Sequence, residues 1–308
     1  MSKILVMDIG GSATKIVVME NNEIVYRGKI PTSTQSLEEF VDNIDKVVNK
    51  VKPAGIAISI PGIVNSKTGL MKHGGSLSFI KDFNMKTFLQ ERYKVKVAIE
   101  NDGKCAALGE LYKGKLQGCE DGVVIVIGTG VGGGIIANGK LLKGEHLSAG
   151  EFSFVRTNDE DPENFRNVWG AKGSSVGLVK RVKLAKGIEG KFDGIDLFKL
   201  IEEKDEVALE AFNSFCKSIA VQIVNIQVIL DPKKIIIGGG ISAQKILTEK
   251  VQAMATELNT IPGMYTPEII VEQSELGNDA NIYGAYYNYI QENIWLCVRR
   301  WLNNMKQD

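Results

Sequence analysis

The sequence predicts an α/β protein made of two related domains around a cleft. Apolar strands alternate with amphipathic helices along most of the 308 residues, which is the order of elements in mixed α/β domains. One succession of strand, glycine turn, strand, asparagine turn and strand also occurs twice, first near the N-terminus and again after residue 122. A repeat at this level indicates two copies of one supersecondary unit.

The first copy of this repeat covers residues 3–26. Its apolar strands lie at residues 3–7, 16–19 and 24–26, and an Asn21-Asn22 turn joins the last two. Between the first two strands runs the sequence Asp8-Ile9-Gly10-Gly11-Ser12-Ala13-Thr14-Lys15. Glycines there let the backbone approach a ligand closely, and successive amides can bind an anion. A plain glycine-rich hairpin is the simpler interpretation, but Asp8, Thr14 and Lys15 favour a site.

Two helix–strand units are predicted to complete the first domain, which we place at residues 1–113. Ser36 and Glu39 have the spacing of a capping box and begin an amphipathic helix. The following elements are a strand at residues 54–60, a glycine-rich loop at 73–79, a helix at 86–92 and a strand ending at Ile99. We expect the helix at about residues 285–308 to join this domain.

The Asn101-Asp102 pair lies where that strand ends and a helix at residues 105–111 begins. An Asp at this place can cap the helix by accepting hydrogen bonds from its first amides. The pair also presents an amide and a carboxylate at the carboxyl end of a strand, where open α/β sheets bind their ligands. For this short stretch alone, capping by Asp102 is the simpler interpretation.

The second copy of the repeat begins the second, larger domain, which we place at residues 114–284. A strand at residues 123–127 is followed by a turn at 128–134, a strand at 135–137, an Asn138-Gly139 turn and a strand at 141–142. Two glycine turns at the same place in a repeat are typical of phosphate binding. The two domains would then each offer one such turn to a ligand in the cleft.

Helices at residues 174–186 and 206–230 continue the second domain, and Val228 and Ile229 are expected to be buried. An acidic segment at 158–165 is expected to be exposed. A strand at 235–237 leads into the glycines at 238–240, a third element of phosphate- or nucleotide-binding type. A strand at 269–271 and a long helix from about Asn278 close the chain. The basic amphipathic part of this helix, residues 294–302, is expected to be a docked or oligomer-contact segment.

Composition argues against several classes of partner. The chain carries 37 basic and 37 acidic residues, so no net charge attracts it to nucleic acid or to a membrane surface. No uninterrupted apolar run reaches the roughly 20 residues of a membrane span, and no secretory signal opens the chain. The four cysteines are Cys105, Cys119, Cys216 and Cys297, and they form no metal-ligand pairs. We expect a cytoplasmic homodimer with no membrane or nucleic-acid partner.

Five ordered motifs resemble those of the ROK family, which comprises bacterial sugar kinases and related repressors. They are Asp8-Ile9-Gly10-Gly11 with Thr14 and Lys15, Glu100-Asn101-Asp102 with Gly109-Glu110, residues 127–134, Ala149-Gly150-Glu151, and Ile237-Gly238-Gly239-Gly240. The match runs from Asp8 to about Ala285. The resemblance implies the duplicated ribonuclease-H-like fold of actin-like and hexokinase-like ATPases, and ATP-dependent phosphorylation of a sugar hydroxyl.

The same resemblance implies a role for each matched residue. Asp102 is expected to be the catalytic base, and Asn101 and Glu151 are expected to bind sugar hydroxyls. Asp8 is expected to associate with Mg²⁺ through water, and Gly75 and Ser76 to contact the substrate. The residues expected to bind ATP and its phosphates are Gly10, Gly11, Thr14, Lys15, Gly128, Thr129, Gly130, Gly239 and Gly240. Such an arrangement suits phosphoryl transfer, which depends on positioning and charge neutralisation.

Two positions depart from the pattern of many family members. Phe154 stands where a zinc-binding His is found, and residues 169–176 contain none of the expected cysteines, so no zinc is expected. Val176 stands where glucose-type kinases have a sugar-binding Glu. Losing both polar contacts would make room at the anomeric carbon. We therefore expect a β-glucoside phosphorylated at its 6-hydroxyl; the alternatives are kinases of glucose, N-acetylmannosamine or fructose.

Other classes fit the sequence less well. A ROK repressor would carry a helix-turn-helix domain of about 70–80 residues before the first strand, whereas seven residues precede Asp8. An actin-like filament ATPase shares the fold, but Asn101 and Asp102 together with Glu151 favour a kinase. A non-catalytic sugar-sensing protein stays open. His73 and His146 are expected in loops, and Cys105 in the packing behind the site.

Overall fold

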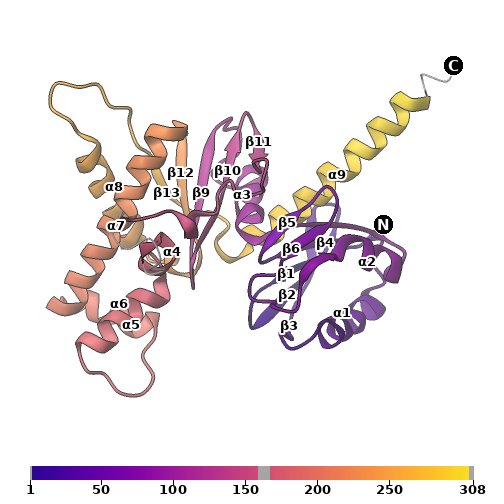
Figure 1. The fold of residues 1–308 in the computed structure, drawn as a ribbon, viewed down its shortest axis with the longest axis horizontal. Coiled ribbons are helices and arrows are strands. Elements are labelled where there is room, and N and C mark those ends of the chain that lie inside the picture. Colours follow the sequence, from indigo (N-terminus) through magenta and orange to yellow (C-terminus); the bar gives the residue numbers. More distant parts are fainter. Residues whose placement is uncertain (1, 159–166, 305–308) are drawn as a thin grey trace. The chain divides into compact units, whose positions relative to one another are not determined.

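The computed structural model describes residues 2–158 and 167–304, with side chains for residues 2–158 and 167–293 (Figure 1). The predicted acidic segment at 158–165 falls almost wholly outside the described residues, as do the side chains of the predicted basic segment at 294–302. Contacts divide the chain into unit 1, consisting of Met1–Lys113, Lys143–Ser148 and Asp279–Asp308, and unit 2, consisting of Gly114–Leu142 and Ala149–Asn278. Lys143–Ser148, which the sequence analysis assigned to the second domain, thus packs with unit 1.

Unit 1 is built on a five-stranded sheet of order β3-β2-β1-β4-β8. Its strands are β1 (Ile4–Ile9), β2 (Ala13–Glu20), β3 (Glu23–Pro31), β4 (Gly55–Ile60) and β8 (Lys96–Asn101). β1, β2 and β3 are antiparallel, whereas β1, β4 and β8 are parallel. Asn21 and Asn22 have φ of 51° and 66°, the left-handed pair that a tight hairpin turn requires. Because the parallel strands end at one edge, Asp8, Ser59 and Asn101 all lie along that edge.

Helices cover both faces of this sheet, as the alternation along β1 requires. Leu5 and Met7 pack toward α1 (Leu37–Val51) and α2 (Met85–Tyr93). Val6 packs on the opposite face, toward α3 (Asp102–Lys113) and α9 (Ala280–Asn304). A small sheet of β5 (Ile63–Asn65), β6 (Leu70–His73) and β7 (Lys81–Asn84) was not predicted, because strands of three or four residues show too few alternations to be recognised.

α3 and α9 approach each other backbone to backbone at two glycines. A Cβ on Gly284 would collide with the Cys105 carbonyl, and one on Gly109 would collide with the Ala280 carbonyl. Only residues without a side chain allow this distance. Cys105 is fully buried in the same contact, and burial raises the pKa of its thiol, so it serves packing as predicted.

Unit 2 repeats the sheet of unit 1. Its order β11-β10-β9-β12-β13 combines β9 (Gly122–Ile127), β10 (Val131–Ala137), β11 (Lys140–Leu142), β12 (Lys234–Gly238) and β13 (Val271–Gln273). β9, β10 and β11 are antiparallel and β9, β12 and β13 parallel. Asn138 and Gly139, at φ of 52° and 69°, repeat the left-handed turn of unit 1. This duplicated topology confirms the predicted fold class.

The predicted turn at residues 128–134 is wrong in its second half. Only Gly128, Thr129 and Gly130 form the turn, and Val131 begins β10, which continues through Gly134. A Cβ on Gly133 would collide with the Val124 carbonyl and with the Phe152 ring. Glycine is needed there for close packing inside a sheet, a second use of glycine that the sequence alone does not distinguish from a turn.

The core of unit 2 lies between the sheet and its helices. The helical elements are η1 (Phe152–Phe154), α4 (Trp169–Lys172), α5 (Ser175–Ala185), α6 (Gly194–Glu202), α7 (Glu206–Leu230), η3 (Gly240–Ala243) and α8 (Lys245–Asn259), followed by η4 (Gly277–Asp279) at the boundary with unit 1. α6 was not predicted from the sequence, whereas a helix start after the glycines at 238–240 was expected, and η3 and α8 follow there. α7 has the predicted bounds, but Val228 and Ile229 are 73% and 77% exposed, because its last turn extends beyond the core.

α7 is also the one helix within the described residues that is long and apolar enough to cross a membrane. Half of its apolar window is buried inside the protein, where Phe212, Phe215 and Ile219 belong to the core of unit 2. The core position accounts for the apolar composition, because a buried helix needs apolar residues around most of its circumference.

Candidate active site

Asp8 lies near the end of β1 and is held on both carboxylate oxygens. Lys15 Nζ donates to Oδ2 at 3.0 Å, while Ser59 Oγ and Asn281 Nδ2 donate to Oδ1 at 2.9 and 3.0 Å. Asp8 and Lys15 are cross-strand partners in β1 and β2, which explains the ion pair. Only 7% of Asp8 is exposed. These donors fix the carboxylate at the mouth of the Gly10-Gly11 turn.

The turn between β1 and β2 is a tight glycine turn. Gly10 N donates to Ala13 O at 3.1 Å, and a Cβ on Gly11 would lie 3.5 Å from the Ser76 side chain. The structure thus brings the predicted phosphate turn beside the predicted substrate residue Ser76. The buried Thr14 hydroxyl lies 2.8 Å from that of Thr32, which is half-buried.

Asn101 and Asp102 share the start of α3, and Asn101 forms the cap. Lys104 N donates to Asn101 Oδ1 at 3.1 Å, the N-cap pattern. The N-cap residue is therefore Asn101 and not Asp102, which is the first residue of the helix, although Asp102 accepts a hydrogen bond from one first-turn amide as predicted. Its Oδ1 accepts from Asn101 Nδ2 at 3.0 Å and from Gly103 N at 2.8 Å. Asn101 is buried while Asp102 is partly exposed, so a fixed carboxylate faces outward from the strand end.

A loop of small residues lies beside Asn101. Asn101 Nδ2 also donates to Gly62 O at 3.0 Å, and a Cβ on Gly62 would collide with the backbone at His73 and Gly74. Gly75, at φ +61°, donates its N–H to His73 Nδ1 at 2.9 Å. Asn101 and the Gly75-Ser76 loop are thus connected through Gly62, which sequence reasoning missed although the Pro61-Gly62 turn signal was visible.

Two glycine turns of unit 2 also lie together. Gly239, at φ +88°, leaves no room for a Cβ against the Ile127 carbonyl, so it packs directly before the Gly128-Thr129-Gly130 turn. Ser175 N and Oγ both donate to Gly128 O, at 3.0 and 2.9 Å. The start of α5 therefore fixes this turn, and Thr129 at its tip is exposed.

A cavity of about 510 Å³ opens beside Gly240. Its lining is mainly apolar and comes from α5, α6 and η3; the residues include Val176, Val179, Phe192, Phe198, Ile241 and Gln244. A cavity of this size with an apolar lining and a few polar groups is typical of a site for a flat organic ligand.

The remaining predicted residues lie in unit 2. Glu151 occupies the N-cap position of η1 without a side-chain cap hydrogen bond, and it follows Gly150, whose φ is +80°. Phe154 in η1 is 61% exposed, and Val176 at the start of α5 is 53% exposed. Glu151 stays a predicted sugar ligand. Val176 lines the apolar cavity next to Gly240, so its location does not support the predicted effect at the anomeric carbon of the sugar.

Among the described residues, no group of three or more His, Cys, Asp or Glu side chains is arranged to hold a metal ion directly. Asp8 fits the role predicted for it, because a cation carried by a nucleotide needs one fixed carboxylate and keeps most of its waters. The donors Ser59 and Asn281, which orient Asp8, were not found from sequence. They lie 51 and 273 residues from it along the chain, and nothing local marks them.

This chain is similar to known proteins over nearly its whole length. The model of the ROK family matches residues 4–292. The β-glucoside kinase of Listeria innocua is 33% identical over 305 residues, covering 94% of this chain and 98% of that protein. The structure of the Lmo2764 protein from Listeria monocytogenes is 29% identical with a TM-score of 0.87, covering 94% and 99% of the two chains. A ROK family protein from Streptococcus pneumoniae in complex with sucrose is 29% identical with a TM-score of 0.85, covering 95% and 99%.

Proposed function

The chain belongs to the ROK family and is an ATP-dependent sugar kinase, and we propose that its acceptor is the 6-hydroxyl of a β-glucoside. The observation that carries the chemistry is the Asp102 carboxylate, partly exposed and fixed by Asn101 Nδ2 and Gly103 N. A base in this state can accept the proton of an attacking hydroxyl without having to reorient.

We propose that Asn101 and the Gly75-Ser76 loop bind the sugar close to Asp102. Asn101 Nδ2 is already directed at Gly62 O and Asp102 Oδ1, so its orientation is fixed before a substrate arrives. Fixed polar groups favour the reacting geometry because little entropy is lost when the sugar binds. Glu151 is proposed as a further ligand of the sugar hydroxyls.

We propose that the phosphates of ATP meet the glycine turns at 10–11 and 128–130, and that the adenosine occupies the cavity beside Gly240. The apolar lining of Val179, Phe192 and Ile241 suits a purine, and Gln244 can supply hydrogen bonds. Mg²⁺ bound to the phosphates would neutralise developing charge, and Asp8 is proposed to orient its waters.

Preference for a glycoside over free glucose is proposed to follow from Phe154. This position carries an exposed ring and no polar group, so it cannot hydrogen-bond an anomeric hydroxyl, and a ring can instead contact an aglycone or a second sugar. The β-glucoside kinase from Listeria innocua and the sucrose complex of the protein from Streptococcus pneumoniae support acceptance of glycosides. A kinase of free glucose or another hexose is the second candidate.

The test compares ATP-dependent phosphorylation of cellobiose, methyl β-glucoside, sucrose and glucose by the purified chain. The proposal expects the largest kcat/KM for the β-glucosides, and NMR of the product should place the phosphate on the 6-oxygen. A strong preference for glucose would contradict the glycoside assignment, and a preference for sucrose would contradict the β configuration. Phosphate on the anomeric oxygen would contradict the proposed orientation of the sugar.

A further inference from the structure

Glu100, the residue before Asn101 and Asp102, carries a fully buried carboxylate that the proposed chemistry does not use. One oxygen, Oε1, accepts from Asn101 N at 2.8 Å. The other, Oε2, lies 2.6 Å from Lys143 Nζ in an ion pair. A buried carboxylate is costly unless it is paired and hydrogen-bonded, and these two partners meet that requirement. Glu100 thus connects the backbone of Asn101 to Lys143.

Lys143 is the residue at which the chain returns from unit 2 to unit 1. It directly follows β11 of unit 2, and the segment Lys143–Ser148 packs with unit 1 before the chain returns to unit 2 at Ala149. Glu151 follows two residues later. The Glu100–Lys143 pair therefore fastens the start of a short segment whose far end leads, through Gly150, into a predicted sugar ligand.

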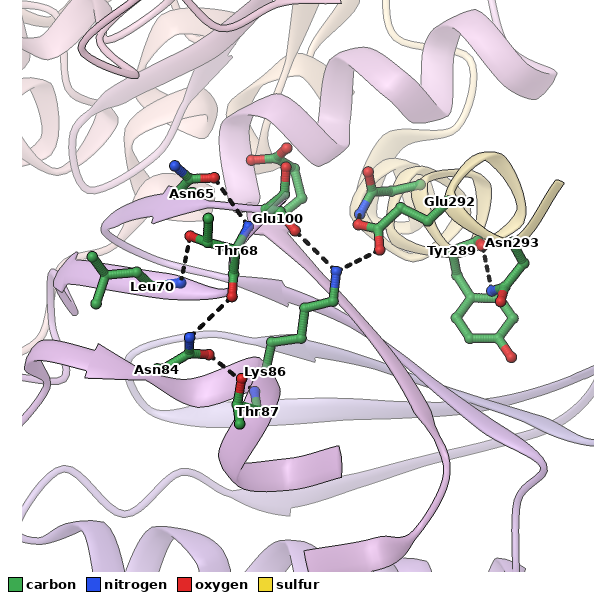
Figure 2. A network of polar contacts seen from close by, with 12 residues as sticks. Asn65, Thr68, Leu70, Asn84, Lys86, Thr87, Glu100, Tyr289, Glu292 and Asn293 are labelled. Carbon is green, nitrogen blue, oxygen red and sulfur yellow. Dashed lines mark hydrogen bonds and ion pairs between the residues drawn. The ribbon is translucent and has the colours of Figure 1, made fainter. Parts of the chain in front are cut away.

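A second ion pair, Lys86–Glu292, is connected to the Glu100–Lys143 pair through Ser66. Lys143 Nζ donates to the Ser66 hydroxyl, while Lys86 Nζ donates to the Ser66 carbonyl at 3.1 Å. Figure 2 shows Lys86 extending from α2 past Glu100 toward Glu292 of α9, to which it is paired at 2.6 Å. The buried Ser66 thus accepts from two lysines, each of which is paired with a glutamate, so the four charges balance.

We propose that Glu100 and Lys143 form a positioning pair for the sugar site, an inference that rests on the proposed function. Lys143 holds Glu100, Glu100 holds the backbone of Asn101, and Asn101 holds Asp102 Oδ1. Neither member of the pair touches the reacting atoms. Because the same lysine anchors the segment leading to Glu151, one ion pair controls how two sugar-binding stretches are presented, and the nucleotide side does not depend on it.

The test compares Lys143→Met with Lys86→Met, which removes the neighbouring lysine but leaves the Glu100–Lys143 pair intact. Lys143→Met is expected to lower cellobiose-dependent turnover about 100-fold, as small misplacements of a reacting group do. The KM for ATP and the slow hydrolysis of ATP without sugar should not change. Lys143→Arg should recover most of the loss, and Lys86→Met should lower the unfolding temperature with little effect on turnover.

Three results would overturn the inference: normal turnover in Lys143→Met, an equal fall of sugar-dependent and sugar-independent turnover, or an equal kinetic loss in Lys86→Met. If Lys143→Met does not fold, Lys143→Gln replaces it. The inference then requires that Lys143→Gln has a lower turnover than Lys143→Arg although the two variants unfold at the same temperature. An inactive wild-type chain would overturn the proposed function itself. An active wild type with a normal Lys143 variant overturns this inference alone.

Discussion

The first hairpins of the two sheets have the same topology but differ in the charge of the side chains next to their glycine turns. In unit 1, β1 and β2 place Asp8 opposite Lys15, one pair before the glycine turn. In unit 2, β9 and β10 place Val126 opposite Gly132 at the corresponding step. The first hairpin has a charged pair at this step, whereas the second has no charged side chain there.

This difference shows how a duplicated fold can divide one task. The backbone geometry needed to approach a phosphate is present in both copies, because both turns contain glycines without obstructing side chains. The charged groups proposed to orient a cation and to accept a proton, Asp8 and Asp102, both belong to unit 1. Substitutions of side chains should therefore matter most in unit 1, and substitutions that change the backbone should matter most in unit 2.

The largest effect is expected for Asp102→Asn. It removes the base but retains the shape, and its amide oxygen can still accept from Gly103 N, so the protein should stay folded. Turnover with a β-glucoside should fall about 10²–10⁴-fold, measured by coupled assay beside a thermal unfolding curve. Near-normal turnover would remove Asp102 from the mechanism and weaken the contrast between the units.

Asp8→Asn and Thr129→Ala compare the two hairpins directly. Asp8→Asn keeps an acceptor for Ser59 but loses the charge that pairs with Lys15, and should lower kcat/KM about 10–100-fold, in the range for residues that orient metal ligands. The loss should be partly recovered at high Mg²⁺. Thr129→Ala leaves the backbone of its turn unchanged and should cost much less. Equal losses in the two variants would refute the division between charge and backbone.

Gly239→Ala tests the backbone of unit 2. The alanine would need a φ of +88° and its Cβ would collide with the Ile127 carbonyl, so a loss of about 1–3 kcal/mol in unfolding free energy is expected from strain. Gly240→Ala is the matched control, because its Cβ would enter open space. Denaturant unfolding of both variants gives the comparison, and equal stability would show that the close approach of Gly239 is not required.

The smallest effect is expected at peripheral carboxylates, one in each unit. Arg92 and Tyr93 donate to Asp45 and hold the pKa of that carboxyl below its usual range; Lys234 does the same to the pKa of Glu272. A carboxyl whose pKa is depressed by folding stabilises the protein at pH values above its unfolded-state pKa, and that stability is lost as the pH falls through its folded-state pKa.

Asp45→Asn and Glu272→Gln should thus lower the unfolding temperature slightly near neutral pH and hardly at about pH 3. Both pairs are at the surface, where such contributions are small; a large effect in one unit alone would contradict this equivalence.

The sequence alone was sufficient to predict the elements that depend on local residue patterns. The hairpins with Asn21-Asn22 and Asn138-Gly139, and α7 from Glu206 to Leu230, need only turn chemistry and periodicity. Their repetition, together with five ordered motifs, predicted the fold. Residues that orient the site could not be predicted in this way, because Asn281 and Lys143 reach Asp8 and Glu100 only after distant segments have packed.

Two errors had the same origin. Asn101 and Asp102 are both good capping residues, and sequence alone could not show that the helix begins at Asp102 and not at residue 105. Likewise, glycines 132–134 could belong to a turn or to a tightly packed strand, and only the Phe152 ring against Gly133 decides between them. In both cases the choice depends on a neighbour that is not local.

The two glycines where α3 meets α9 have a consequence for synthesis on the ribosome. α3 carries Asp102, but the helix that packs against its backbone begins at Ala280, after every residue of unit 2 has been made. Unit 2 can fold as soon as it emerges, whereas unit 1 stays incomplete until the last segment is released. A released fragment that ends at residue 279 should therefore show protease resistance in unit 2 and cleavage around Cys105. The helix that carries the proposed catalytic carboxylate is thus the last to be covered as the chain is made.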